Sequence, residues 1–351
     1  MGSQIEKEKP GAALSYRDAG VDLDAAERAK ARLKSLVAST RDENTLSELG
    51  SFGGLYLVPP GFSAPVLVAS ADGVGTKLKV AFAANRHTTV GRDLVNHCVN
   101  DILVQGARPI FFLDYVALGA MDEAVVTDIV SGVANGCRDN GCALLGGETA
   151  QMPNFYAQGE YDLAGFIVGV VERDRVLDGS RVRSGDALVG IASTGLHTNG
   201  YTLARKIVFD HLGLGAGDPF PGTGRSVADE LLEAHRSYLR PMLPLLDAGK
   251  VHALAHITGG GIPGNLPRVL GPSLGAVVHR KSWQAPAVFE GLRHGGSVEL
   301  EEMDRVFNMG VGMIAVVAPA DADSVVASLR ASGENAWLLG EIEPGQGVRY
   351  V

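Results

Sequence analysis

Cysteine is scarce in this sequence, and its pattern excludes two kinds of stabilised domain. The chain has three cysteines, Cys98, Cys137 and Cys142, an odd number without the C-x-x-C pairs typical of zinc ligands. We therefore expect neither a disulfide framework nor a zinc site. Cys98 falls in an apolar helical pattern and Cys142 begins a strand-like run, where cysteine behaves as a small buried hydrophobe. A catalytic thiol stays open as an alternative.

A hydrophobic run long enough to cross a membrane is also missing. The longest apolar runs, at 166–171 and 313–318, have the length of strands, whereas a bilayer requires about 20 residues. The residues after Met1 are polar and lack the apolar core of a signal peptide. These features predict a cytoplasmic protein without a membrane partner.

No stripe of lysine and arginine stands out. The chain carries 31 basic and 40 acidic residues, a net charge of −9, so a nucleic acid would have to bind against the overall field. We expect no nucleic-acid partner. The 351 residues, 46% hydrophobic and 20% charged, fit a globular protein of about two domains with sizeable cores.

Composition and periodicity divide the chain into three parts. Residues 1–55 form a polar arm with a helical pattern at 25–37 and a glycine-rich loop at 50–54; residues 56–172 and 173–351 form an N-terminal and a C-terminal domain. Apolar runs predict strands at 66–69, 110–116, 143–145, 163–171, 187–192, 253–257, 276–279, 312–317 and 336–342. Helices are expected at 91–105, 123–140, 201–211, 227–247, 285–293 and 322–331. This alternation predicts a layered α/β or α+β fold.

The helix expected at 91–105 has an apolar side and a polar side. Its core face carries Leu94, Val95, Cys98, Val99, Ile102 and Leu103, and the other side carries Asp93, His97, Asn100 and Asp101. The helix at 123–140 should end at Gly141, as a helix with a left-handed cap does.

Three acids follow strands or share that polar helix side. Asp72 lies in SADGVGTK (70–77), Asp101 in VND (99–101) and Glu148 in GGETAQMP (146–153). If they converge at one sheet edge, they suit a magnesium–phosphate site, because Mg²⁺ prefers hard oxygen ligands and usually takes one or two carboxylates plus phosphate oxygens. Glycines 73 and 75 would admit phosphates to the backbone, and Lys77 would supply a charge. The alternative is that these segments are ordinary turns with solvated acids.

The glycine patterns do not by themselves establish a nucleotide site. The spacing around Gly73 and Gly75 is not that of a Walker A loop. A G-x-G-x-x-G pattern occurs at 259–264, but it contains Pro263, and the next strand ends in His279-Arg280 rather than in an acid for a ribose. We therefore do not favour a nicotinamide site. The segment 258–265 predicts either a backbone cradle for one phosphate or a tight turn.

A polar loop, STGLHTNGY (193–201), joins a strand to a helix. Thr198 or Asn199 is expected to cap the helix, and His197 either transfers protons near neutral pH or orients substrate and satisfies the loop. His87, His235 and His294 show no partner spacing and are expected at the surface. Trp283 and Trp337 are expected to pack rather than to stack on a ligand.

Eight motifs lie in order along nearly the whole chain: SYRDAGVD (15–22), SADGVGTK, VNDILVQGARPIFFLDY (99–115), GGETAQMP, DLAGFIVG (162–169), STGLHTNGY, ITGGGIPGNLPRVL (257–270) and FNMGVGM (307–313). Together they resemble the phosphoribosylformylglycinamidine cyclo-ligase family, the aminoimidazole ribonucleotide synthetases. An ordered set of this kind is far more specific than one glycine loop.

The resemblance implies an ATP-dependent ring closure in purine biosynthesis. Formylglycinamidine ribonucleotide becomes 5-aminoimidazole ribonucleotide through an iminophosphate, with release of ADP and phosphate. It also implies a two-domain layered fold and a homodimer whose N-terminal strands form a barrel near the active sites. The alternatives are another ATP-dependent phosphoryl-transfer enzyme of the same superfamily and a non-catalytic nucleotide-binding protein. A selenophosphate synthetase type would commonly need a reactive Cys or selenocysteine, which residues 15–22 lack.

The same resemblance assigns residues to ATP and its metal. It implies that Asp72, Asp101 and Glu148 bind Mg²⁺–ATP, with K⁺ as a further candidate ion, and that Gly73, Gly75, Thr76 and Lys77 lie near the phosphates. Lys34 aligns with a lysine of the family's N-terminal arm that resembles an ATP-site contact. Gln151 stands where the family commonly has glutamate, so we do not count it as a metal ligand.

The remaining assignments concern substrate and catalysis. His197 and Asn199 match the family's polar active-site loop, in which Thr198 replaces the usual serine and keeps its hydroxyl. Gly259, Gly260 and Gly261 match a loop suited to the ribose 5′-phosphate.

Overall fold

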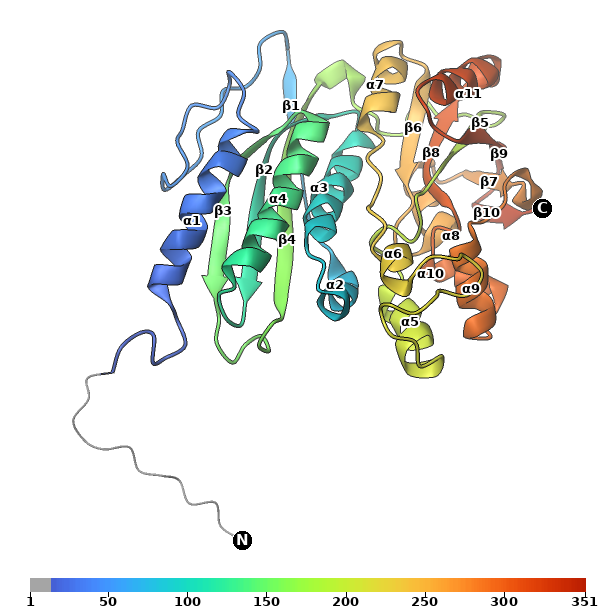
Figure 1. Ribbon diagram of the computed structural model, residues 1–351. Helices are drawn as coiled ribbons and strands as arrows, with labels where there is room; N and C mark the ends of the chain where they lie inside the picture. The colour runs from blue at the N-terminus through green and yellow to red at the C-terminus, as the bar shows by residue number, and fades with distance from the viewer. Residues whose placement is uncertain (1–13) are drawn as a thin grey trace.

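Two β-sheets form the framework of the structure, a computed structural model that describes residues 14–351 (Figure 1). The first sheet has four strands in the order β1-β4-β2-β3, and the second has six in the order β10-β7-β9-β5-β8-β6. Helices pack on both, so the predicted layered α/β fold is confirmed. None of the described helices is long and apolar enough to span a bilayer.

The strands are β1 Pro65–Gly73, β2 Arg108–Leu118, β3 Ala143–Gln151, β4 Tyr161–Glu172, β5 Ala187–Ala192, β6 Val251–His256, β7 Leu274–Val278, β8 Val311–Val317, β9 Ala336–Pro344 and β10 Gly347–Tyr350. The helices are α1 Leu23–Ala38, α2 Leu78–Ala84, α3 Thr88–Leu103, α4 Glu123–Asn140, α5 Tyr201–Arg205, α6 Val227–Leu231, α7 Leu239–Asp247, α8 Gly261–Asn265, α9 Ala287–Gly295, α10 Leu300–Val306 and α11 Ala322–Ala331. Strand β10 and the short helices α2 and α10 were not predicted.

The first sheet is covered on one face and open on the other. Helices α3 and α4 lie side by side over one face, and α1 packs against α4 and β3 (Figure 1). Residues of β1 alternate accordingly: Val66 and Val68 are partly buried against the core, whereas Leu67 is 59% exposed. Phe166 of β4 is also exposed on the open face. The helix predicted to end at Gly141 does so, with Gly141 at φ 66°.

Helix α3 lies at the interface between the two domains. Its apolar residues face the core of the first domain, as expected. Its polar residues Asp93, His97 and Asn100 are buried as well, at 0%, 4% and 0% exposure, because the C-terminal domain covers them. Buried polar groups require partners, and they find them in C-terminal loops.

The expected helix at 227–247 is wrong, because it breaks between α6 and α7. The side chains of α3 bind the backbone of the intervening loop instead. Asp93 accepts from His235 N at 2.6 Å, Asn96 donates to His235 O at 2.7 Å, and Asn100 accepts from Tyr238 N at 3.0 Å. These contacts with another domain replace the helical hydrogen bonds that the local sequence would support.

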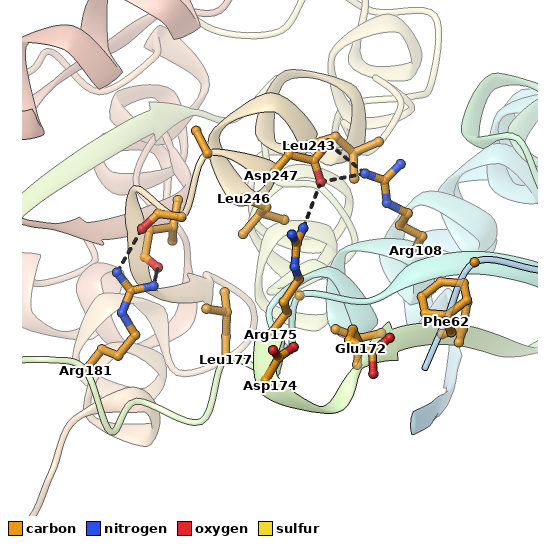
Figure 2. A pocket seen from close by; sticks show the side chains of 17 residues that line it. Phe62, Arg108, Glu172, Asp174, Arg175, Leu177, Arg181, Leu243, Leu246 and Asp247 are labelled. Atoms are coloured by element: carbon orange, nitrogen blue, oxygen red, sulfur yellow. Dashed lines mark hydrogen bonds and ion pairs between the residues drawn. The ribbon is translucent and has the colours of Figure 1, made fainter. Parts of the chain in front are cut away.

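A cavity of about 560 Å³ opens between the domains just beyond the C-terminal end of α3. There Arg108 Nη2, from β2, donates to both carboxylate oxygens of Asp247 on α7. Arg175, from the segment that joins the sheets, approaches the same carboxylate (Figure 2). The domains are therefore linked at both ends of their interface.

Candidate active site

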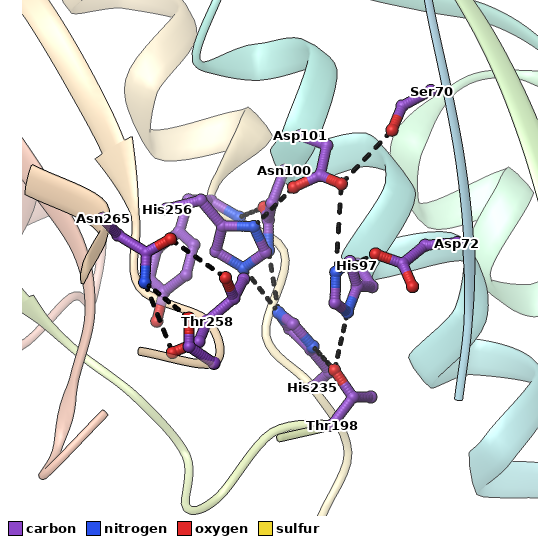
Figure 3. A network of polar contacts seen from close by, with 12 residues as sticks. Ser70, Asp72, His97, Asn100, Asp101, Thr198, His235, His256, Thr258 and Asn265 are labelled. Carbon is purple, nitrogen blue, oxygen red and sulfur yellow. Dashed lines mark hydrogen bonds and ion pairs between the residues drawn. The ribbon is translucent and has the colours of Figure 1, made fainter. Parts of the chain in front are cut away.

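A chain of polar contacts crosses the interface between the two domains (Figure 3). Asp72 Oδ2 lies 2.8 Å from His97 Nε2, and His97 Nδ1 lies 2.6 Å from Thr198 Oγ1. Thr198 Oγ1 is 3.2 Å from His235 Nδ1. His235 Nε2 is 3.1 Å from His256 Nε2, and His256 Nδ1 is 2.9 Å from Asp101 Oδ1. The network therefore begins and ends on the two acids predicted from the sequence.

Regular elements fix the positions of these groups. Asp72 lies at the end of β1, and His256 is the last residue of β6. His97 and Asp101 are four residues apart on α3, so they lie on one side of the helix. Ser70 Oγ is 3.3 Å from Asp101 Oδ2, within hydrogen-bond range. The structure thus confirms that the end of β1 and the polar side of α3 come together.

Both carboxylates are held in their ionised form. Burial opposes ionisation of Asp72, but the hydrogen bond and charge of His97 outweigh it and lower the pKa of Asp72. Burial likewise opposes ionisation of Asp101, and the hydrogen bond from His256 lowers its pKa. The pKa of His97 is raised, because its bond to Asp72 and the charge of Asp101 overcome its own burial. Asp72 and Asp101 keep partly exposed side chains, at 42% and 28%.

His197 is buried beside this network in a left-handed conformation, with φ 62°. Its Nε2 accepts a hydrogen bond from Thr194 N at 3.1 Å, its Nδ1 has no partner among the described residues, and its ring stacks on His235 at 4.1 Å. Burial and nearby positive charge hold the pKa of His197 well below its usual value. Its visible contacts are therefore those of a neutral ring that satisfies its own loop.

Thr198 and Asn199 do not cap the following helix as expected. The N-cap of α5 is Gly200, without a side-chain hydrogen bond, because Thr198 turns into the histidine network. The Nδ2 of Asn199 is buried without a partner in the described chain. A Cβ on Gly259 would lie 3.2 Å from Asn199 Oδ1. The polar loop and the glycine loop at 259–261, far apart in sequence, are thus neighbours.

Lys77 does not lie where a charge for phosphates would be expected. It is fully buried, with Nζ 2.8 Å from Asp93 Oδ2, and it donates to the carbonyls of His197 at 3.0 Å and Glu233 at 2.7 Å. The ion pair and these two carbonyls account for its donors. Close by, Thr76 reaches Thr202 through their hydroxyls at 3.0 Å, again across the domain interface.

Glu148 does not join Asp72 and Asp101 within one chain. Across the sheet, Glu148 of β3 pairs with Tyr115 of β2. Tyr115 pairs in turn with Ala164 of β4, and Ala164 pairs with Gly73 of β1. The acid is therefore three strand spacings, about 14 Å, from β1. It is also one position out of the row of Asp72, so its side chain leaves the sheet on the other face. Lys34 is exposed on α1, which packs near β3, so it too lies away from Asp72.

The match to known proteins extends over both domains. The family model described as AIR synthase related protein, N-terminal domain, matches residues 62–171, and its C-terminal counterpart matches residues 183–351. A protein of Sorangium cellulosum named phosphoribosylformylglycinamidine cyclo-ligase is 53% identical over 331 residues, 94% of this chain and 95% of that protein. One of the same name from Trichlorobacter lovleyi is 51% identical over 330 residues, with the same shares of each chain. The chain belongs to the phosphoribosylformylglycinamidine cyclo-ligase family.

Solved structures share the fold of this chain. A thiamine-monophosphate kinase from Stenotrophomonas maltophilia has a TM-score of 0.68 at 19% identity, covering 94% of this chain and 96% of its own. Hydrogenase maturation protein HypE, solved in complex with ATP, has a TM-score of 0.62 at 22% identity, covering 90% and 86%. At these identities the likeness concerns the fold alone.

Sequence reasoning missed part of this candidate site. His235 and His87 were expected at the surface but are buried, at 1% and 6% exposure, whereas His294 is exposed as predicted. His97 was placed on the polar helix side without a role, and His256 was not singled out. The four-residue spacing of His97 and Asp101 was an available signal; nothing local to His235 marked its contact with another domain.

Proposed function

We propose that this chain catalyses the ATP-dependent cyclisation of formylglycinamidine ribonucleotide to 5-aminoimidazole ribonucleotide, with release of ADP and phosphate. The observation that carries the proposal is the identity of about half of all residues to cyclo-ligases along both domains. The pairing of Asp72 and Asp101 at the domain interface supports it. A cytoplasmic location and a K⁺ requirement stay predictions.

The chemistry requires an oxygen to become a leaving group. Phosphorylation of the formamide oxygen by ATP gives an iminophosphate; a nitrogen of the same molecule then attacks its carbon, and phosphate departs with the oxygen. The protein has to hold two reactants in line and balance charge. The Asn199 amide nitrogen, which lies beside Gly259 and has no partner among residues 14–351, supplies a donor on the C-terminal side of the site. We assign the 5′-phosphate of the substrate to this loop.

A divalent ion fits the acids at the end of β1 and on α3. Asp72 and Asp101 are ionised and partly exposed, and both lie near His97 Nε2, so they offer hard oxygen ligands. A bound Mg²⁺ would neutralise charge on the transferring phosphoryl group. Gly73 and Gly75 carry no side chains that would keep a phosphate from the backbone. We propose that these two glycines and Thr76 lie near the ATP phosphates.

We further propose a homodimer that completes this site. Asp72 lies on edge strand β1, and Glu148 lies on the opposite edge strand β3, so one sheet cannot bring them together. The open face with exposed Leu67 and Phe166 provides an apolar surface for a second sheet. Closing two sheets into a barrel, with β1 of one subunit beside β3 of the other, would bring two groups of the partner subunit to the edge that carries Asp72: the partner's Lys34 on the outer, helix-covered side, and the partner's Glu148 at the strand end on the barrel side.

The reaction is tested by incubating the protein with ATP, Mg²⁺ and formylglycinamidine ribonucleotide and measuring ADP and aminoimidazole. Both products should appear in equal amounts, and ADP should not form without the ribonucleotide. ADP formation independent of that substrate would refute the proposal. A phosphorylated product without ring closure would indicate another enzyme of the superfamily.

A further inference from the structure

We propose that His97 is a nitrogen ligand of the divalent ion held by Asp72 and Asp101, and that the site consequently binds Mn²⁺ more tightly than Mg²⁺. The inference rests on the proposed function only in placing a metal at these two acids. It adds a third ligand, from this chain's own α3, and a preference among metals.

The imidazole nitrogen His97 Nε2 is the atom that lies near both acids. His97 Nε2 lies 2.8 Å from Asp72 Oδ2 and 3.8 Å from Asp101 Oδ2. Two ligand atoms at right angles, each about 2.1 Å from an ion, are about 3 Å apart. Small side-chain shifts would therefore give one ion all three ligands. The exposed sides of both carboxylates leave room for phosphate oxygens or water.

Each ligand is oriented by a partner on its far side. His97 Nδ1 is bonded to Thr198 Oγ1 at 2.6 Å, which aims Nε2 between the two acids. Asp101 is held by His256 Nδ1 at 2.9 Å, and Asp72 accepts from Gly73 N at 2.7 Å. Outer contacts of this kind fix the direction of metal-binding imidazoles and carboxylates.

Among the described residues, two groups have ligand atoms within 4.8 Å of one another. One, His97, Asp101 and His256, shares two members with the proposed site. The other, His197, His235 and His256, has a geometry that does not suit a metal. The rings of His197 and His235 stack with only 19° between their planes, so their in-plane lone pairs run side by side rather than toward one point. His235 Nε2 also lies 3.1 Å from the side-chain amide nitrogen of Asn100, Nδ2. The group at Asp72 is the better site.

The ligand chemistry gives the metal preference. Mg²⁺ favours oxygen ligands and sheds water reluctantly, whereas imidazole nitrogen suits first-row transition ions. A site with two carboxylates and one imidazole should therefore favour Mn²⁺ over Mg²⁺ by at least about tenfold. Loss of the imidazole should remove most of that difference.

The test is Mn²⁺ binding to the full-length protein without nucleotide. Free Mn²⁺ is measured by electron paramagnetic resonance, with Mg²⁺ as competitor, and pulsed resonance detects ¹⁴N coupled to the bound ion. The wild type should show the ¹⁴N signal and a Mn²⁺ affinity at least tenfold above that for Mg²⁺. His97→Asn should lose the signal and reduce the ratio about tenfold, while His294→Asn, changed at an exposed histidine, should match the wild type.

His97→Leu gives a second variant without any ligand atom, and circular dichroism checks the fold of all three. Bound Mn²⁺ without ¹⁴N coupling in the wild type, or a signal that survives in both His97 variants, would overturn the inference and leave the cyclisation untouched. Absence of Mn²⁺ binding also overturns it. Failure of the proposed function is seen separately, as ADP formation that does not require the ribonucleotide.

Discussion

Lys77 Nζ lies 2.8 Å from Asp93 Oδ2, and both side chains are fully buried between the two domains. The same ammonium group donates to the carbonyl of His197 and to that of Glu233. One lysine of the N-terminal domain therefore holds both C-terminal loops that carry site histidines. Removing one partner of a buried pair leaves an uncompensated charge, which costs more than the pair contributes.

The first prediction concerns this pair. Lys77→Met should lower the free energy of unfolding by about 3–5 kcal/mol, because Asp93 would remain buried without its cation. Lys79→Met is the matched control, since Lys79 pairs with Glu160 at the surface and should cost no more than about 1 kcal/mol. Denaturant titration measures the free energy of unfolding of both variants. An equal decrease in the two would show that Lys77 does not hold the two domains together.

A second prediction concerns the link between the acids and the histidines. Thr198→Val removes the hydroxyl that contacts both His97 and His235 and should cost about 1–3 kcal/mol of stability, because two buried ring nitrogens lose their partner. Thr198→Ser keeps the hydroxyl and should retain nearly wild-type stability and turnover. A valine variant as stable and active as the serine variant would contradict this role.

The third prediction tests Asp72 in catalysis. Asp72→Asn should raise the KM for Mg²⁺–ATP by about 10–100-fold and leave the melting temperature nearly unchanged, since the side chain is 42% exposed. Asp323→Asn, at an exposed position of α11, is the control. Normal activity of Asp72→Asn at both low and saturating ATP would remove this residue from the site.

The fourth prediction is a pH dependence of stability at Asp114. This acid lies on the helix-covered face of β2, and a Cβ on Gly147 would fall 1.8 Å from its Oδ1. Burial raises the pKa of Asp114 from 3.8 to about 7. The folded chain thus holds a proton that the unfolded chain releases, so this group destabilises the fold increasingly as pH rises from about 4 to 7.

Asp114→Asn should remove this decrease in folding stability at higher pH. At pH 8 the variant should be more stable than the wild type, by at most about 4 kcal/mol from the size of the shift, whereas at pH 4 the two should differ little. Unfolding at a series of pH values decides the matter. A variant that is less stable at pH 8 would show that the ionised carboxylate is held by a partner after all.

Sequence patterns predicted the parts of the site that depend on local structure. Asp72 at a strand end and Asp101 on the polar side of α3 follow from periodicity, and the structure brings them together. The prediction that Glu148 converges with these two acids is wrong within one chain. The strand order β1-β4-β2-β3 places β3 at the far edge of the sheet, and no local pattern encodes which strands become neighbours.

The histidine network shows the same limit between domains. His235 lies in a stretch with a helical pattern, but Asp93 and Asn96 of α3 bind its backbone and break the helix. Lys77 follows a glycine loop and resembles a phosphate ligand, yet domain packing covers it. In each case contacts more than one hundred residues away in sequence override the local preference.

The central claim is that one catalytic site takes Asp72 from one subunit and Glu148 from the other. The direct test mixes two variants, Asp72→Asn and Glu148→Gln, after separate purification, under conditions that exchange subunits and at an ATP concentration too low for either variant alone to turn over. Each mixed dimer would contain one site with both acids intact, so substrate-dependent formation of ADP and aminoimidazole should return on mixing. Activity that stays at the level of the separate variants, although mixed dimers form, would contradict the shared site.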